Sequence, residues 1–236
     1  MKIGILAAGI TPDSLLGKFP TYANMFAEQL GKLQQDFSFA TYDVRLDEFP
    51  NSAEECDAWL ITGSKADAYS DEPWILRLCT LIKEIDQLQR PLVGICFGHQ
   101  VIARALGGRV EKFQGGWGVG IHQYDICGSL PVLPEAKELA LCAFHQDQVV
   151  EKPARARVIL RSEFCENAGL LYEDHILTFQ GHPEFSKVYE KALVNLYDGK
   201  QLTQEQAKTA LNSLESSDIH SNQMMSWIGL FLKKES

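Results

Sequence analysis

The chain has 236 residues, of which 45% are hydrophobic and 22% are charged, the balance of a folded globular protein. This length suits one large domain, or one domain with a small extension, whose core needs no disulfide or metal for stability. The net charge is −9 and the basic residues form no stripe, which argues against binding to nucleic acid or to an acidic membrane surface.

The six cysteines are scattered and form no CxxC pair, so the sequence does not favour a zinc or iron–sulfur site. Free thiols are typical of a reducing cytosol. The apolar run Met1–Gly9 is too short for a signal peptide, and no stretch approaches the roughly 20 apolar residues of a membrane span. We therefore expect a cytoplasmic protein without a bound metal.

In the first half of the chain, apolar strand-like runs alternate with segments of helical periodicity. The predicted strands are Lys2–Ala8, Phe37–Leu46, Ala58–Thr62 and Pro91–Ile95. The predicted helices are Thr21–Leu33, Trp74–Leu88 and one that contains Val101–Leu106. This alternation predicts an α/β fold, with an open and mostly parallel sheet flanked by helices.

The middle of the chain begins with Gly108–Ile126, which is rich in glycine and β-formers, and continues with further strand-like pieces that predict a smaller antiparallel edge. Its strand-like pieces are Glu138–Phe144, Val158–Ser162, Gly169–Tyr172 and His175–Gln180. The glycine-rich run Gly115–Gly120 does not join a strand to a helix and lacks the lysine of a phosphate loop, so we expect a turn near the site and no nucleotide cofactor.

The tail has helical signals. Ser186 is placed to cap a helix over Lys187–Asp198, with Gly199 as its stop, and Thr203 with Gln206 has the spacing of a capping box. We therefore divide the chain into a domain over residues 1–200 and a helical extension over 201–236. One face of the last helix carries an apolar stripe that packs on the core or, alternatively, meets a partner: Met224, Trp227, Ile228 and Phe231.

The sharpest local motif is Gly94-Ile95-Cys96-Phe97-Gly98, which lies between a buried strand and a helix. It has the pattern of a nucleophile elbow, a strained turn on which side chains two positions from the nucleophile would collide. The start of the following helix favours a thiolate at Cys96 and aims the Phe97 amide where an oxyanion would form. The alternative is a buried structural cysteine between two packing glycines.

A cysteine nucleophile needs a base, and His182 is the strongest candidate among the six histidines. It stands in Gln180-Gly181-His182-Pro183-Glu184, directly after a predicted strand, where open α/β sheets bind ligands. Residues two apart in an extended segment point to the same side, so Glu184 is placed to orient His182. Taken alone, this segment would be a plausible surface turn.

These two motifs, in this order, resemble the class I (triad-type) glutamine amidotransferases. Two further stretches agree, namely the small-residue turn Ile61–Ser64 and the segment Phe144–Val149, which is similar to the family's Ser-His-Gly-Asp-x-Val stretch. The resemblance covers about residues 1–197 and is greatest to stand-alone proteins similar to the amidotransferase domain of GMP synthase. It implies a flavodoxin-like fold.

The resemblance also implies roles. Cys96 would attack a γ-glutamyl amide and form a thioester, His182 would act as its base and Glu184 would orient His182. An oxyanion would be held by the amides of Phe97 and of Gly63 or Ser64. The glutamyl amino acid end would be contacted by Gln100 and the backbone of Phe144 and His145, where His145 itself is expected to be structural.

Three residues depart from the family pattern. Lys65 stands where many members carry proline, Phe144 replaces a small serine, and Gly118 falls where an acidic residue is common. Three functions therefore stay open. The first is hydrolysis of glutamine, with ammonia passed to a possible synthetase partner. The second is a stand-alone γ-glutamyl peptidase acting on γ-glutamyl peptides or glutathione conjugates. The third is a non-catalytic binding or regulatory protein.

Overall fold

Eleven strands form two sheets within residues 1–128 and 135–233, the part of the chain that this computed structural model describes. The strand order of the larger sheet is β2-β1-β3-β4-β11-β10-β9-β6-β7, and β5 pairs with β8 in a separate ribbon. The strands are β1 (Lys2–Leu6), β2 (Ser38–Tyr42), β3 (Ala58–Ile61), β4 (Leu92–Ile95), β5 (Arg109–Lys112), β6 (Gly118–Ile126), β7 (Glu138–His145), β8 (Asp147–Glu151), β9 (Ala156–Arg161), β10 (Gly169–Tyr172) and β11 (Ile176–Phe179).

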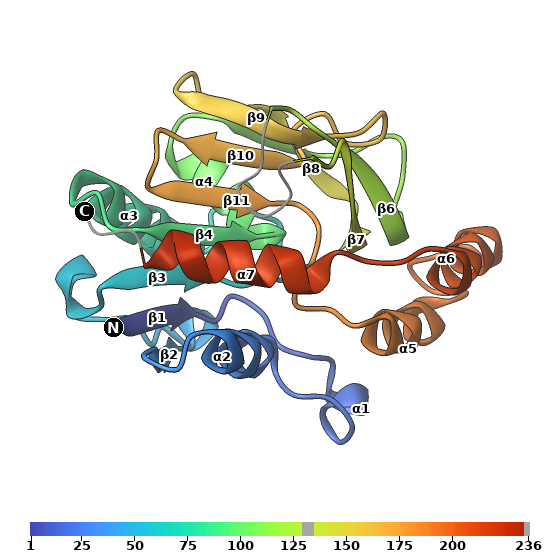
Figure 1. The fold of residues 1–236 in the computed structure, drawn as a ribbon, viewed down its shortest axis with the longest axis horizontal. Coiled ribbons are helices and arrows are strands. Elements are labelled where there is room, and N and C mark those ends of the chain that lie inside the picture. The colour runs from blue at the N-terminus through green and yellow to red at the C-terminus, as the bar shows by residue number, and fades with distance from the viewer. Residues whose placement is uncertain (129–134, 234–236) are drawn as a thin grey trace.

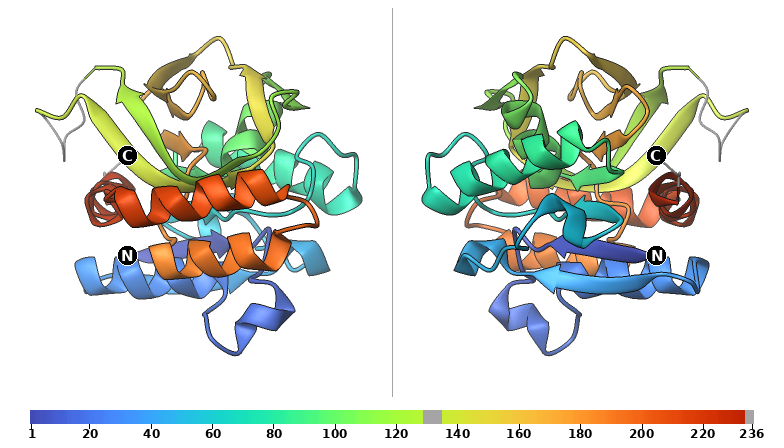
Figure 2. Two further views of the ribbon diagram at one scale, coloured as in Figure 1. Left: turned by 90° about the vertical axis from the view of Figure 1, so that its right-hand side faces the viewer. Right: turned by 90° about the vertical axis from the view of Figure 1, so that its left-hand side faces the viewer.

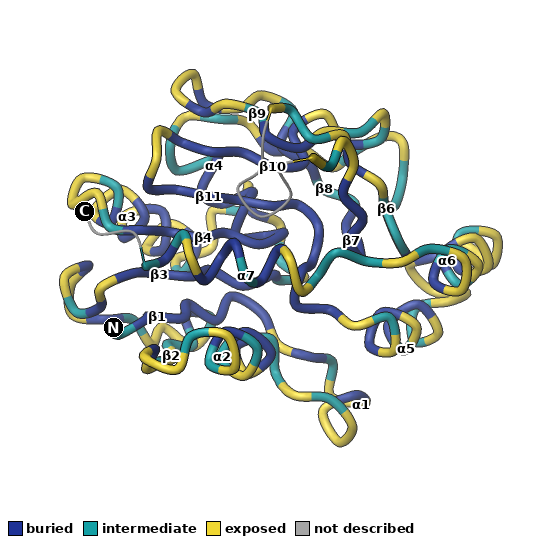
Figure 3. The backbone as a smooth tube through the Cα atoms, viewed as in Figure 1, coloured by how far each residue is buried: buried dark blue, intermediate teal, exposed yellow. Residues whose placement is uncertain are grey.

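The larger sheet is parallel on one side and antiparallel on the other. Strands β2, β1, β3, β4 and β11 are parallel, whereas β10, β9, β6 and β7 continue the sheet in antiparallel order. The prediction of a mostly parallel, helix-flanked sheet with an antiparallel edge is confirmed. The parallel strands β3, β4 and β11 are buried along their length (Figure 3), as expected for a sheet covered on both faces.

Two strand predictions need correction. The sequence places the run His175–Gln180 in the antiparallel edge, but its core forms β11, which pairs in parallel with β4 at the centre of the sheet. The predicted strand Phe37–Leu46 ends earlier, because Tyr42 closes β2 and a 3₁₀ turn follows over Val44–Leu46. Asp47, in a left-handed conformation at φ 62°, ends that turn.

The helices cover both faces of the sheet. Helices α2 (Tyr22–Leu33) and α7 (Ser221–Leu232) lie on one face, and α3 (Pro73–Gln87) and α4 (Phe97–Ala105) lie on the other (Figures 1 and 2). The remaining helices are the short α1 (Asp13–Leu16), which the sequence did not predict, and α5 (Lys187–Tyr197) and α6 (Gln204–Ser216), which pack beside β6 and β7.

The last helix packs on the core, as the first interpretation of its stripe predicts. Met224, Trp227 and Ile228 are buried in the same apolar cluster as Ile3 and Ile5 of the first strand, and Phe231 packs against that cluster. The cap predictions are also confirmed. The Ser186 hydroxyl accepts from the Tyr189 amide at the start of α5, and both hydrogen bonds of the Thr203–Gln206 capping box are present. No helix of the described residues is long and apolar enough to cross a membrane.

Candidate active site

Cys96 occupies the turn between β4 and α4. Its φ of 53° and ψ of −104° place it in a strained conformation that non-glycine residues rarely adopt. The flanking glycines allow this turn, because a Cβ at Gly94 would lie 2.7 Å from the Gly98 backbone, and one at Gly98 would lie 2.4 Å from the Ile61 carbonyl oxygen. The structure thus places the sulfur above the end of a central parallel strand, in the geometry of a nucleophile elbow.

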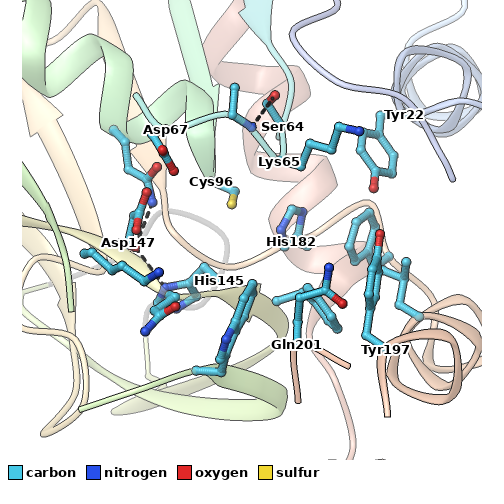
Figure 4. A pocket seen from close by; sticks show the side chains of 18 residues that line it. Tyr22, Ser64, Lys65, Asp67, Cys96, His145, Asp147, His182, Tyr197 and Gln201 are labelled. Atoms are coloured by element: carbon cyan, nitrogen blue, oxygen red, sulfur yellow. Dashed lines mark hydrogen bonds between the residues drawn. The ribbon is translucent and has the colours of Figure 1, made fainter. Parts of the chain in front are cut away.

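The His182 side chain lies near Cys96 (Figure 4), and Glu184 lies against His182. The His182 Nδ1–H donates to Glu184 Oε1 at 2.8 Å, and both side chains are buried. This bond fixes the tautomer in which Nε2 is left for the thiol. The His182 amide donates to the Cys142 carbonyl at 2.8 Å, and the imidazole stacks on Phe185 with a centroid distance of 4.0 Å. Three contacts therefore fix His182: the backbone bond to Cys142, the bond from its ring to Glu184, and the stacking on Phe185.

The electrostatics favour a charged imidazole. Burial lowers the pKa of His182, but the Glu184 carboxylate and the Cys96 sulfur, both hydrogen-bonded to the ring, raise the pKa well above 6.5 overall. The arrangement therefore favours a protonated His182 imidazole, a form that can give a proton to a neighbouring group.

Three backbone amides in the turns at and beside Cys96 have no acceptor in the described chain: those of Gly63, Ser64 and Phe97. Phe97 is the first residue of α4, so its amide has no partner within the helix. Gly63 passes close to His182 and Cys96, because a Cβ there would lie 3.0 Å from His182 Cε1 and 3.6 Å from Cys96 Cβ. These amides are placed to donate to an oxygen held at the sulfur.

A cavity of about 340 Å³ opens above the thiol. Gln100, Phe144 and His145, the residues predicted to contact the substrate, all line it. Gln100 donates through Nε2 to the Asp147 carbonyl at 2.8 Å and to Gln180 Oε1 at 3.1 Å, so its amide is fixed in place. The His145 Nδ1–H donates to the same carbonyl at 3.1 Å, and burial lowers the pKa of His145 to about 3. A neutral, backbone-bonded imidazole fits a structural role.

Several residues of the cavity wall were not predicted from the sequence. Asp67 and Asp147 lie side by side at one end (Figure 4). Burial and then the neighbouring Asp67 raise the pKa of Asp147 to about 6, while Lys112 opposes the shift. Tyr22, at the other end, starts a helix far from any of the motifs. Only Asp147, which stands inside the Phe144–Val149 motif, could have been found from the sequence.

The departures from the family pattern have different structural settings. Gly118 is tightly enclosed, since a Cβ there would lie 2.6 Å from Phe164 and 3.0 Å from His145 Nε2, so no acidic side chain fits. Phe144 forms part of the cavity wall together with Trp117 and Tyr197, at ring-centroid distances of 5.5 and 5.4 Å.

Within the described residues, no group of three or more His, Cys, Asp or Glu side chains could hold a metal ion.

Comparisons with known proteins identify the family and the fold of the chain. The family model for glutamine amidotransferase class-I matches residues 18–195. The chain is 35% identical to γ-glutamyl peptidase 2 of Arabidopsis thaliana, over 75% of this chain and 74% of the relative, and 31% identical to γ-glutamyl peptidase 4 of the same plant, over 95% and 93%. The crystal structure of a Thermotoga maritima glutamine amidotransferase has the same fold, with a TM-score of 0.77 and 21% identity over 99% of each chain.

A mostly parallel sheet flanked by helices, together with the matching family model, defines the class of protein. The chain belongs to the class-I glutamine amidotransferase family and is a glutamine amidotransferase-like enzyme.

Proposed function

We propose that this protein hydrolyses a γ-glutamyl amide bond through a thioester on Cys96. The sulfur attacks the side-chain carbonyl carbon, the carbon–nitrogen bond breaks, and His182 gives its proton to the leaving amine. Water then gives a proton to His182 and attacks the thioester carbon, the carbon–sulfur bond breaks, glutamate is released, and the proton on His182 is returned to the Cys96 sulfur. Glu184 orients the imidazole throughout. The observation that carries this proposal is the 2.8 Å His182–Glu184 bond beside a strained cysteine at the base of a cavity.

The oxyanion of each tetrahedral intermediate would be stabilised by the amides of Phe97 and of Gly63 or Ser64, which have no other acceptor in the described chain. Gln100 and the backbone of Phe144 and His145 would contact the glutamyl head group, in keeping with their position on the cavity wall. All of these steps use side chains and amides of the chain itself, so the proposal includes no cofactor. The six free cysteines support a cytoplasmic setting for this thiol chemistry.

Two leaving amines are candidates. Glutamine would release ammonia, which the family name supports, and a synthetase partner would then be the acceptor. A γ-glutamyl peptide would release an amino acid or peptide, which the names of the plant relatives support. A non-catalytic binding role is less well supported, because binding alone does not require the buried His182–Glu184 pair.

The test is turnover by the purified protein and its Cys96→Ala variant, each offered glutamine and γ-glutamyl dipeptides. Wild-type protein should release glutamate from at least one of them, and the variant should lose several orders of magnitude in rate. Fast dipeptide cleavage with little glutaminase activity would select the peptidase candidate. Glutaminase activity that needs a second protein would select the amidotransferase. A variant that retains near-normal rates would refute Cys96 as the nucleophile.

A further inference from the structure

The cavity has two chemically different ends, one on each side of Cys96 (Figure 4). Asp67, Asp147 and His145 lie at one end. His182, Tyr22 and Tyr197 lie at the other, together with Lys65, whose side chain extends toward Tyr22. A substrate that spans the thiol must therefore place one half of itself at each end.

The chemistry of the triad decides which half goes where. His182 must protonate the nitrogen that leaves, so the leaving group has to depart on the His182 side of the sulfur. The glutamyl half then extends toward the other end, where Gln100 lies on the cavity wall and its amide is fixed by the Asp147 carbonyl. The carboxyl pair Asp67 and Asp147 at that end matches the α-ammonium group that every γ-glutamyl substrate carries.

The leaving-group end is larger than ammonia requires. Its walls are the rings of Tyr22, Phe185 and Tyr197 with the Leu193 side chain, which belong to one apolar cluster, and Gln201 lies near Tyr197 (Figure 4). Such an apolar surface can pack against the carbon atoms of an amino acid or peptide, whereas ammonia has no carbon atoms to contact it.

Lys65 is the basic side chain at this end. It is exposed, and within the described residues it forms no ion pair or hydrogen bond. At the opposite end, by contrast, Lys112 already interacts with the carboxyl group of Asp147. An unpaired ammonium group beside the leaving group of a peptide substrate matches the one charge that such a leaving group always carries, its C-terminal carboxylate.

We propose that Lys65 binds the free carboxylate of the amino acid or peptide that leaves, and so selects γ-glutamyl peptides over glutamine. This inference rests on the proposed hydrolysis of γ-glutamyl amides. It gives a function to one of the residues that departs from the family pattern, because the proline common at this position has no charge to offer.

The experiment compares substrates that differ only in that carboxylate. The specificity constant kcat/KM is measured for γ-glutamylglycine, which carries the carboxylate, and for γ-glutamylglycinamide, which lacks it. The variants are Lys65→Met, Lys65→Arg and, as the matched control at the opposite end of the cavity, Lys112→Met. Because Lys65 is exposed, its replacement should leave the fold intact, which a thermal melt will verify.

Wild-type enzyme should prefer γ-glutamylglycine, and Lys65→Met should reduce that preference roughly fivefold, through kcat/KM of the carboxylate substrate alone. Lys65→Arg should retain most of the preference. Lys112→Met should change both substrates by the same factor, since it lies on the glutamyl side.

Equal rates on both substrates, or a preference that survives in Lys65→Met, would overturn the role of Lys65 and leave the proposed hydrolysis standing. No release of glutamate from any γ-glutamyl compound, with Cys96 still open to alkylation, would instead refute the proposed function, and this inference with it. The two failures therefore give different patterns.

Discussion

Glu184 is enclosed by protein and contacts no solvent through its side chain, yet one of its oxygens, Oε2, has no hydrogen-bond donor in the described chain. A buried carboxylate is stabilised when a cation lies next to it. The His182 imidazole at 2.8 Å is that cation once it is protonated. Glu184 and His182 thus stabilise each other's charge. The carboxylate raises the pKa of the imidazole, and the imidazolium offsets the cost of burying the carboxylate.

We expect Glu184→Gln to lower kcat by about a hundredfold or more. The amide oxygen can still accept from Nδ1–H, but without the negative charge the pKa of His182 falls and the protonated form that releases the amine is lost. Steady-state kinetics with a γ-glutamyl substrate measures this effect, and the rate of alkylation of Cys96 by iodoacetamide should fall with it. A variant with wild-type kcat would show that the carboxylate has no part in orienting or charging the base.

Glu190 is a second buried acid close to the site. It is fully buried, its Oε1 accepts from the Gly120 amide at 3.1 Å, and burial raises its pKa to about 8. In the unfolded chain this group ionises near its ordinary pKa, so between that value and about 8 the folded protein holds a proton that the unfolded chain has lost. Its stabilising contribution is complete below that window and is lost as the pH rises through it.

Glu190→Gln should remove this dependence. The amide still accepts from Gly120 but does not titrate, so the melting temperature of the variant relative to wild type should rise by several degrees from about pH 5 to about pH 8. Thermal unfolding followed by circular dichroism at a series of pH values measures it. A difference that stays constant with pH would contradict the assignment of Glu190 as a protonated acid in the folded state.

The elbow between β4 and α4 is a property of an element and its neighbours. Gly98 lies against β3 so closely that a Cβ would meet the Ile61 carbonyl oxygen at 2.4 Å. Since backbone cannot move aside as a flexible side chain does, we expect Gly98→Ala to lower the free energy of unfolding by about 3 kcal/mol. Urea denaturation measures the change.

The matched control for that substitution is Gly17→Ala. Gly17 ends α1 with φ of −71°, and nothing lies within 4 Å of an added Cβ. This variant should be as stable as wild type or slightly more so, because alanine restricts the unfolded chain. Equal losses at Gly98 and Gly17 would mean that close packing of the elbow is not what requires glycine.

The elements differ in how well their sequences predict them. Amphipathic helices, such as the one predicted over Trp74–Leu88, carry their own periodicity, and caps such as Ser186 depend on neighbours only a few residues away. The direction of β11 could not be predicted in this way, because the sequence of a short apolar run does not indicate which strand it will pair with. The tertiary structure determines which strand β11 pairs with, and therefore whether it lies in the parallel or the antiparallel part of the sheet.

The same reasoning applies to the site. Cys96, His182 and Glu184 could be proposed because each lies in a local motif next to a strand end. Lys65 and Asp67 follow β3 in a loop, and Tyr22 begins α2, so their approach to the thiol depends on how distant segments pack. The three candidate catalytic residues were therefore within reach of the sequence, whereas the approach of Lys65, Asp67 and Tyr22 to the thiol was not.

At the scale of the whole molecule, the C-terminal helices complete both the core and the site. Helix α7 shares a cluster with the first strand, and the Trp227 ring packs on Phe179 of β11 at a centroid distance of 5.6 Å. Gln201, at the start of the extension predicted over 201–236, lines the cavity. We propose that this extension is needed both for stability and for enclosing the substrate.

Trp227→Ala should lower the free energy of unfolding by about 3 kcal/mol or more, since it removes a large buried ring and leaves a cavity against β11. Leu230→Ala on the exposed face of the same helix is the control and should change the stability by less than about 0.5 kcal/mol. Denaturant titrations of both variants give the comparison. Similar small effects would show that α7 contributes little to the core.

The central claim, that Cys96 carries a γ-glutamyl thioester, is tested most directly by trapping the intermediate. Enzyme mixed with excess γ-glutamyl substrate is quenched in acid during turnover, and the intact protein and its peptides are examined by mass spectrometry. The account predicts a fraction of the protein heavier by one glutamyl residue, with the added mass on the peptide that contains Cys96 and absent from Cys96→Ala. Turnover without any such adduct under a range of quench times, or an adduct on another residue, would contradict it.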